Sequence, residues 1–185
     1  ALPAATVYAH DAAYVGAPRA TKLAQVRAAM AQQGASHHFI STVDDIAWLF
    51  NLRGSDVDYN PVFLAHALID TREATLFVGA GKISTELQAA LLQDGVQVAD
   101  YAHARAALAA LPASAVLLLD PKRVTLGLRE GAGAAVRVVE ALNPSVLLKS
   151  RKNAAEAAHI RQAMEQDGAA MCAFYAWFEA ALARG

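Results

Sequence analysis

The sequence predicts an α/β domain in which helices flank a mixed β-sheet, followed by a long C-terminal helix. Apolar segments of strand length alternate along the chain with segments of helical period. The strand-like segments are apolar on both faces, as expected of a sheet that is covered on both sides. The character of the sequence changes after Pro144, and from Asn153 to Ala183 almost every residue apart from Gly168 favours helix. We therefore place the layered domain in residues 20–150 and the long helix in residues 151–185.

The composition is that of a folded protein with no strong field of either sign. Of 185 residues, 56% are hydrophobic and 18% are charged, which excludes a mainly disordered chain. The 16 Lys and Arg nearly balance the 17 Asp and Glu, so we expect neither a nucleic acid nor a membrane as partner. The single cysteine, Cys172, fits a reducing compartment. With no signal-peptide pattern and no apolar run of membrane-spanning length, we expect a cytoplasmic protein.

The N-terminal half of the chain contains several local start and stop signals. Residues 1–19 show no clean period and are interpreted as a linker from an upstream domain. A stripe at helical spacing predicts a helix over residues 22–30, ended by Gly34. Residues 37–41 predict a buried strand. Asp44 and Asp45 follow two hydroxyl residues and predict the capped start of a short helix.

The turn-rich segment NLRGSDVDYNP, residues 51–61, predicts a substantial loop. Beyond it the alternation continues, with strands at 62–69, 74–78, 96–99, 115–119 and 136–139 and helices at 84–92, 103–110 and 124–129. Asn153 and Glu156 then predict a capping box for the last helix, which continues to Ala183.

The last helix has a bulky apolar face but no obvious partner for it. A helix of this kind gains most of its stability from packing, and the domain before it looks complete. We therefore interpret it as the first element of a further domain. The residues of this face are Ile160, Met164, Met171, Phe174, Tyr175 and Phe178.

Two segments resemble the aminopeptidase P family of the creatinase/prolidase superfamily. The first is STVDDIAWLFNLRGSD, residues 41–56, continued by YNPVF at residues 59–63. The second is the Lys152-Asn153, Glu156 and Arg161 pattern, similar to the family's junction into its catalytic domain. The resemblance implies the creatinase N-terminal α/β fold. It also implies the middle domain of the three-domain form, followed by the first helix of the catalytic domain.

The resemblance also implies a function for the parent protein. Members of the family remove the N-terminal residue that precedes proline, using two divalent metals, usually manganese, and a metal-bound hydroxide. Their ligands belong to the catalytic domain, so the resemblance implies no catalytic residue and no metal ligand in this chain. The implied partners are that catalytic domain, a second copy in a homodimer and, in the parent, short proline-containing peptides. The alternative is a stand-alone interaction module without catalysis, whose last helix would fold back and hide its apolar face.

The loop of residues 51–60 is the candidate functional segment, with Arg53, Asp56, Tyr59 and Asn60 as candidate cleft or domain-contact residues. Loops on rigid scaffolds commonly carry function. The resemblance implies that this domain walls the active-site cleft and supports dimerisation. Arg53 would then pair with a carboxylate of the substrate or of the catalytic domain. The alternative is an internal network between Arg53 and Asp56 that only fixes the loop.

Other candidate motifs favour structural roles. His37 and His38 are adjacent in a predicted strand and point to opposite faces, which disfavours chelation of one metal. The segment from Gly79 to Lys82 fails as a phosphate loop, because Leu76 stands where glycine is needed and no Ser or Thr follows Lys82.

Three further features also carry little functional signal. Gly131-Ala-Gly133 precedes a strand, so dinucleotide binding is unsupported. Cys172 is expected to be buried, and Trp48 and Trp177 are expected to be packing residues. A small-ligand or nucleotide-binding function would rest on fold analogy alone.

Overall fold

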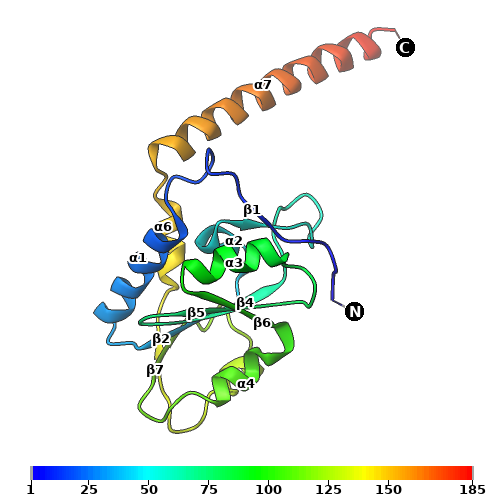
Figure 1. The fold of residues 1–185 in the computed structure, drawn as a ribbon. Helices are drawn as coiled ribbons and strands as arrows, with labels where there is room; N and C mark the ends of the chain where they lie inside the picture. Colours follow the sequence, from blue (N-terminus) through cyan, green and yellow to red (C-terminus); the bar gives the residue numbers. More distant parts are fainter. Residues whose placement is uncertain (1, 185) are drawn as a thin grey trace. The chain divides into compact units, whose positions relative to one another are not determined.

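The computed structural model describes residues 2–184, which form two compact units. The first unit contains the residues up to His10 together with Ala17–Arg151, and the second contains Asp11–Gly16 together with the residues from Lys152 onward. Figure 1 shows the sheet and its helices in the first unit and one long helix in the second.

A six-stranded sheet forms the centre of the first unit, in the order β6-β5-β4-β2-β7-β8. Strand β4 runs antiparallel to its neighbours β2 and β5, whereas the pairs β5–β6, β2–β7 and β7–β8 are parallel. The predicted mixed sheet is therefore confirmed. The strands are β2 (His37–Ile40), β4 (Ala65–Asp70), β5 (Ala74–Val78), β6 (Val96–Asp100), β7 (Val116–Leu119) and β8 (Arg137–Glu140).

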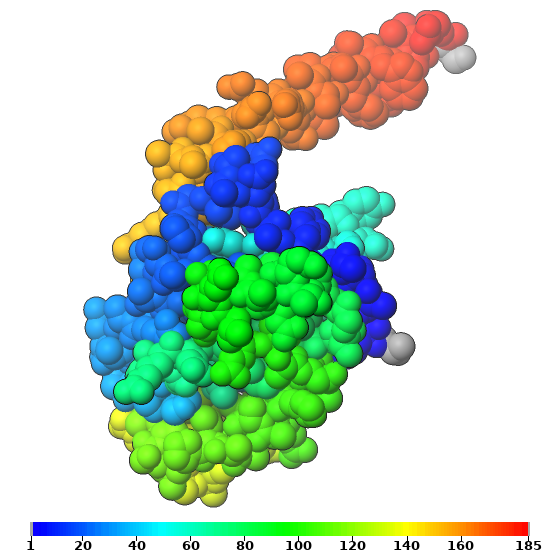
Figure 2. Space-filling view, in the orientation of Figure 1, coloured from blue at the N-terminus to red at the C-terminus, as the bar shows by residue number. Residues whose placement is uncertain are grey.

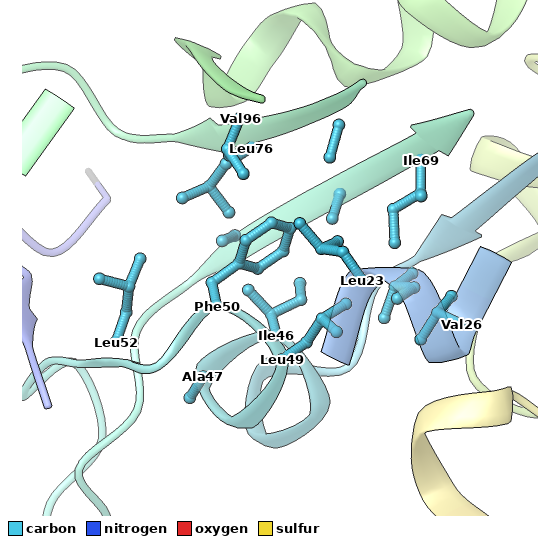
Figure 3. Close-up of a cluster of buried hydrophobic side chains, with 14 of the residues drawn as sticks. Leu23, Val26, Ile46, Ala47, Leu49, Phe50, Leu52, Ile69, Leu76 and Val96 are labelled. Atoms are coloured by element: carbon cyan, nitrogen blue, oxygen red, sulfur yellow. The ribbon is translucent and has the colours of Figure 1, made fainter. Parts of the chain in front are cut away.

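Helices pack on both faces of this sheet and create two apolar clusters. The larger cluster joins one face to α1 (Arg19–Gln32), α2 (Val43–Phe50), α3 (Thr85–Gln93) and α6 (Pro144–Ser150). The smaller cluster joins the other face to α4 (Ala104–Ala109) and α5 (Leu126–Arg129), and the 3-10 turn η1 (Tyr101–His103) precedes α4. Figure 3 shows Phe50 and Leu23 in the larger cluster. Each fully buried side chain of this size contributes about 1.5–3 kcal/mol.

The boundaries of the first helices follow local signals. Helix α1 buries Leu23, Val26 and Met30, which lie one turn apart on a single face. Gly34 follows its end with φ of 64°, a left-handed conformation that glycine adopts without strain. Thr42 occupies the N-cap position of α2, although its side chain makes no capping hydrogen bond.

Several elements differ from the sequence prediction. Two short strands, β1 (Tyr8–Ala9) and β3 (Leu52–Arg53), pair antiparallel within segments expected to be a linker and a loop. Two-residue strands are too short to show a period. Strand β4 begins three residues later than expected, because Val62 accepts a hydrogen bond from Asp56 N in the preceding loop. Helix α6 was not predicted, although Asn143 caps it and Pro144 is its first residue.

The second unit consists of α7 (Ala154–Leu182) and the segment Asp11–Gly16. The predicted capping box is confirmed: Asn153 Oδ1 accepts from Glu156 N, and Glu156 Oε2 accepts from Asn153 N. The ring of Tyr14 lies edge-on to the ring of His159, with centroids 4.8 Å apart. The side chain of Asn153 lies where a Cβ on Gly16 would stand. The short segment therefore packs closely against the first turns of α7.

The long helix exposes its large side chains. Cys172 is exposed, so the prediction that it is buried was wrong, and Trp177 is also exposed rather than packed in a core. No helix in residues 2–184 is both long and apolar enough to cross a lipid bilayer. The large apolar side chains of α7 are 44–66% exposed, namely Ile160, Met164, Met171, Phe174, Tyr175, Trp177, Phe178 and Leu182.

Replacing Gly16 by alanine is expected to disturb the start of α7. The added methyl group would displace the Asn153 side chain and cost the capping hydrogen bond that its Oδ1 accepts from Glu156 N, about 0.5–2 kcal/mol. Amide hydrogen exchange in the first turn of α7 measures this loss. Gly168→Ala is the matched control: no atom lies within 4 Å of its new Cβ, and it should stabilise the helix by up to about 1 kcal/mol. Equal effects of Gly16→Ala in the wild-type and Asn153→Ala backgrounds would contradict the proposed contact.

Candidate functional site

The candidate loop starts from a left-handed residue at the end of α2. Asn51 has φ of 53°, and its side chain fixes the turn from both ends. Its Oδ1 accepts from Lys22 Nζ at 2.6 Å, and its Nδ2 donates to Ala17 O at 3.0 Å. The same lysine lies 4.3 Å above the ring of Trp48. The chain therefore leaves α2 along a fixed path into β3.

Gly54, the glycine of the NLRGSD motif, is required by close packing. A Cβ at this position would lie 2.8 Å from Phe63 Cβ and 3.3 Å from Val62 O. The Gly54 amide also donates to Pro61 O at 3.3 Å, which ties the two sides of the loop together. Phe63 is fully buried, so neither neighbour can easily move aside.

Arg53 is half-buried at the base of the loop. Its guanidinium donates to Ala47 O at 3.0 Å and to Leu52 O at 2.8 Å. Burial lowers its pKa, while the nearby Tyr8 opposes this shift. No carboxylate within residues 2–184 forms an ion pair with Arg53, so the Arg53–Asp56 network considered above is not formed there.

Asp56 instead forms a buried ion pair with Lys82. The two side chains are 0% and 2% exposed, and the same carboxylate oxygen, Oδ2, accepts from Leu64 N at 2.7 Å. The other oxygen, Oδ1, is buried without a hydrogen-bond partner among the described residues. Sequence reasoning missed Lys82 as a functional partner of the loop. The Lys82 amine is also buried against Asp56 and is not presented to solvent, as the lysine of a phosphate loop would be.

Tyr59 and Asn60 lie at the exposed tip of the loop. Asn60 N donates to Val57 O at 3.2 Å, and Val57 and Asn60 form an isolated β-bridge that closes a tight turn. Tyr59 has φ of 60°, which costs a bulky residue about 1–3 kcal/mol, and its side chain is fully exposed. The structure thus separates the four candidates: Arg53 and Asp56 hold the base, whereas Tyr59 and Asn60 face solvent.

A second polar cluster, which the sequence did not reveal, lies at the carboxyl ends of β2, β7 and β8. Asn143 is 2% exposed and stands at its centre. Its Oδ1 accepts from Ser145 N at 3.1 Å and from Ser145 Oγ at 2.7 Å, and its Nδ2 donates to Asp45 Oδ2 at 3.1 Å. Its own amide donates to Asp120 Oδ2 at 3.3 Å. The backbone donor of Ser145 fixes the orientation of the Asn143 amide.

His38 joins this cluster from the sheet. Its Nε2 lies 3.0 Å from Asn143 Oδ1, and its Nδ1 lies 3.0 Å from Leu118 O. Burial lowers the pKa of His38, and the contacts with Leu118, Asn143 and the nearby carboxylates act in the opposite sense. His37 bonds to Ser36 Oγ through Nδ1 instead. Both ring nitrogens of His38 thus contact polar groups of the protein interior.

Asp44 and Asp45, at the start of α2, form ion pairs with Lys149, and Asp45 also contacts Asn143 in this cluster. Asp45 is fully buried and accepts from Thr42 Oγ1, while its Oδ1 lies 2.8 Å from Lys149 Nζ. Asp44 also pairs with Lys149. Burial raises the pKa of Asp44, but the nearby Lys149 amine outweighs this effect, so the net shift is downward. For Lys149 the signs are reversed: burial lowers its pKa, but the carboxylates of Asp44 and Asp45 outweigh this effect, so the net shift is upward. Asp44 and Asp45 thus lie in the first turn of α2, as predicted, and Asp45 also forms a long-range pair with Lys149.

The described residues do not supply a donor set for a metal ion. Nowhere in residues 2–184 do three or more His, Cys, Asp or Glu side chains converge in a way that could hold one. The described residues therefore do not fit the two divalent metals that the resemblance implies.

Comparison with known proteins identifies the family. Residues 1–156 match the Creatinase/Prolidase N-terminal domain. The chain is 35% identical over 173 residues to a probable Xaa-Pro aminopeptidase P from Botryotinia fuckeliana, covering 90% of this chain and 26% of the relative. It is 34% identical over 186 residues to a probable Xaa-Pro aminopeptidase P from Talaromyces marneffei, covering 97% and 28% respectively. The chain thus spans little more than a quarter of these relatives.

Solved structures give the same result. An X-prolyl aminopeptidase from Caenorhabditis elegans, described as a cytosolic enzyme with a di-nuclear active site, superposes with a TM-score of 0.89 at 25% identity. The match covers 100% of this chain and 31% of that enzyme. The prolidase from Pyrococcus horikoshii shares the fold, with a TM-score of 0.56 at 17% identity over 83% of this chain and 42% of that protein. With its mixed sheet, its loop motif and its match over residues 1–156, the chain belongs to the Creatinase/Prolidase N-terminal domain family.

Proposed function

We propose that this chain is the non-catalytic middle domain of an X-Pro aminopeptidase, together with the first helix of its catalytic domain. The parent protein removes the N-terminal residue before proline in short peptides, in the cytoplasm. It uses two divalent metals, manganese in our proposal, held by the catalytic domain. Within the parent, the present segment walls the active-site cleft and supports dimerisation.

One observation carries this proposal. The whole chain superposes on part of an X-prolyl aminopeptidase, whereas that enzyme is about three times as long, since the match covers only 31% of it. The match covers a similarly small share of the curated relatives, 26% and 28% of their length, and both are named as probable Xaa-Pro aminopeptidases. A segment that corresponds to one part of a larger peptidase is best explained as a supporting domain.

The loop geometry supports a role in walling the cleft. Its base is fixed by the buried pair of Asp56 and Lys82, and its tip presents Tyr59 to solvent in a strained conformation. An aromatic side chain has few rotatable bonds and loses little conformational entropy when it contacts a ligand or another domain. The fixed backbone of the loop therefore presents the Tyr59 and Asn60 side chains to solvent at one place.

The exposed face of α7 supports its assignment to a further domain. An interaction module with a folded-back helix would hide Met164, Met171, Phe174 and Phe178, yet these side chains are 44–60% exposed. An apolar face of this extent gains stability only by packing against another surface. No observation favours the stand-alone module.

The test compares the full-length protein of the source gene with its Tyr59→Ala variant. The assay uses manganese and an X-Pro tripeptide. We expect kcat/KM of the variant to fall at least tenfold, mainly through a higher KM, because in our proposal Tyr59 lines the cleft that binds the substrate. Its unfolding temperature should not change, since the side chain is fully exposed. Leu126→Ala is the control: this side chain is 65% exposed on α5, and activity should be retained.

The 185-residue chain alone provides the second arm of this test. We expect no metal-dependent cleavage of the tripeptide by this chain. Clear cleavage would contradict its assignment as a non-catalytic segment. A full-length protein without X-Pro cleavage would overturn the proposed activity of the parent, and unchanged kinetics in Tyr59→Ala would remove the loop from the cleft.

A further inference from the structure

A hollow of about 400 Å³ lies at the carboxyl ends of β7 and β8. The two strands are parallel neighbours, with Leu119 opposite Glu140, so the chain leaves both of them at the same edge of the sheet. The hollow is lined by residues 120–123, which follow β7, and by residues 140–142 at the end of β8. Its volume is within the range of small-molecule sites. Figure 2 shows part of the segment from β7 to β8, in yellow-green and yellow, at the lower end of the view.

The connections that follow β7 and β8 leave to opposite faces of the sheet. After β7 the chain passes to α5, where Leu128 packs on the smaller apolar cluster. After β8 it passes to α6, where Leu148 packs on the larger cluster of the other face. In open α/β sheets, ligands bind in the crevice that forms where two adjacent parallel strands diverge in this way. The topology therefore favours a ligand site at this hollow.

Asp120 fixes the backbone around the hollow. Its side chain is 5% exposed, and its Oδ1 accepts from Lys122 N at 3.0 Å. Its Oδ2 accepts from Asn143 N at 3.3 Å, and its main-chain oxygen accepts from Arg123 N at 3.0 Å. The carboxylate thus joins the chain after β7 to the chain after β8. The side chains of Lys122 and Arg123 remain outside this network.

The basic side chains of the hollow have no acidic partner. Within residues 2–184, no carboxylate lies within 4 Å of the Lys122 amine or the Arg123 guanidinium. Glu140 is already paired with an arginine of α5. Burial raises the pKa of Asp44 and Lys149 lowers it, and Arg123 makes a smaller contribution in the same direction as Lys149. Lys122 and Arg123 can therefore offer their charges to an anion.

The rest of the lining indicates which kind of anion fits. Leu142 is 59% exposed on one wall, and Pro121 and Ala141 add apolar surface. The lining also contains the carboxylates of Asp120 and Glu140, which oppose a phosphate dianion more strongly than a singly charged anion. A monoanion with a hydrocarbon part matches this combination of groups.

We propose that the hollow binds an aliphatic monocarboxylate, with its carboxylate on Lys122 and Arg123 and its hydrocarbon chain on Leu142. A guanidinium binds a carboxylate through two parallel hydrogen bonds, which gives the group a fixed orientation. A free branched-chain acid and the C-terminal end of a peptide both present this chemistry. The proposal does not rest on the aminopeptidase assignment, and its test measures no peptide cleavage.

Titration of the 185-residue chain, followed by the NMR shifts of its amides, tests the site with isocaproate as the probe. We expect saturable shifts at Lys122, Arg123 and Leu142. Isocaproamide has the same shape without the charge and should bind at least tenfold more weakly. Inorganic phosphate should also bind more weakly than isocaproate. The proposal would be overturned by the absence of saturable shifts at the hollow, or by equally tight binding of isocaproamide or phosphate.

Two charge-matched variants separate this site from a general attraction for anions. Arg123→Gln removes one positive charge from the hollow and should weaken isocaproate binding at least tenfold. Arg72→Gln removes the same charge from the turn between β4 and β5 and should leave binding unchanged. Both arginines are exposed, so the unfolding temperature without ligand should stay close to wild type. Equal losses of binding in the two variants would contradict the proposal.

The contact with the hydrocarbon chain is tested with acetate, which carries the same charge without the chain. The wild-type chain should bind isocaproate more tightly than acetate. Leu142→Ala should remove most of this preference and leave acetate binding unchanged. A preference that survives in Leu142→Ala would overturn the proposed position of the hydrocarbon chain.

N-acetyl-leucine distinguishes the two sources of the ligand, because it mimics the C-terminal end of a peptide. Binding tighter than that of isocaproate assigns a peptide end to the site. Weaker binding assigns a free acid. Either result supports the monocarboxylate site, provided that Arg123→Gln weakens it.

Discussion

Replacing Lys82 by alanine is expected to lower the free energy of unfolding by about 3–5 kcal/mol. The substitution leaves the Asp56 carboxylate buried and without its counter-ion, since both side chains are almost completely excluded from solvent. One Asp56 oxygen already lacks a hydrogen-bond partner within the described chain, so little compensation is at hand. Urea unfolding followed by circular dichroism measures the effect, which is large compared with the stability of a typical domain.

An exposed ion pair supplies the matched control. Arg129 and Glu140 are 47% and 41% exposed, so Arg129→Ala should cost only about 0–1 kcal/mol. The double variant Lys82→Met, Asp56→Leu should regain part of the loss, because no buried charge is left unpaired. A Lys82→Ala variant as stable as Arg129→Ala would show that the pair does not hold the loop. Limited proteolysis near Tyr59 should become faster only in the Lys82 variant.

Asn143→Ala is expected to cost about 2–4 kcal/mol, because one side chain satisfies several buried groups at once. Without it, Asp45 loses a donor, the amide and hydroxyl of Ser145 lose an acceptor, and the imidazole of His38 loses its polar contact at Nε2. Unsatisfied buried groups cost more than the hydrogen bonds contributed, since water cannot replace the missing partner. The loss should appear in the urea midpoint with little change in the denaturant slope.

The control for this experiment is Asn60→Ala, at the exposed tip of the loop, where the effect should stay within about 0.5 kcal/mol. The ring nitrogens of His38 offer a local measurement. Their NMR chemical shifts should change in Asn143→Ala and remain at wild-type values in Asn60→Ala. Unchanged His38 shifts together with wild-type stability would mean that Asn143 is not the centre of the cluster.

Much of the fold could be predicted because its signals are local. The run from Ala74 to Val78 is apolar and bounded by turn formers, and β5 has these very bounds. Asn153 and Glu156 are three residues apart, so the capping box of α7 is visible without any tertiary information. Asn143-Pro144 is also a local start signal, and it marks the start of α6, which the sequence prediction did not include.

The sites could not be predicted in the same way, because their partners are distant in the sequence. Asp56 lies in the loop and Lys82 follows β5, 26 residues later in the sequence. His38 and Asn143 are 105 residues apart in the sequence. No spacing rule relates such residues before the sheet order is known. The loop motif did direct attention to Asp56, but Arg53 was the nearest cation in the sequence and was the wrong partner.

Burial on α7 was misjudged for a physical reason of another kind. The apolar character of Cys172 and Trp177 was correctly noted, but burial depends on a neighbouring surface, which sequence character alone does not supply. Among the described residues of the second unit, Asp11–Gly16 packs against α7 near its first turns. The same apolar residues can therefore be exposed in one chain context and buried in another.

The packing of Asp11–Gly16 against the start of α7 has a consequence for the order of events on the ribosome. The segment that contains Tyr14 and Gly16 leaves the exit tunnel early, whereas Asn153 and His159 leave it only after the whole sheet has been synthesised. Translation proceeds at about 5–20 residues per second, so the N-terminal segment waits several seconds for its partner. The sheet and its helices can fold during that interval. The capping contact thus forms only after the sheet of the first unit has been synthesised.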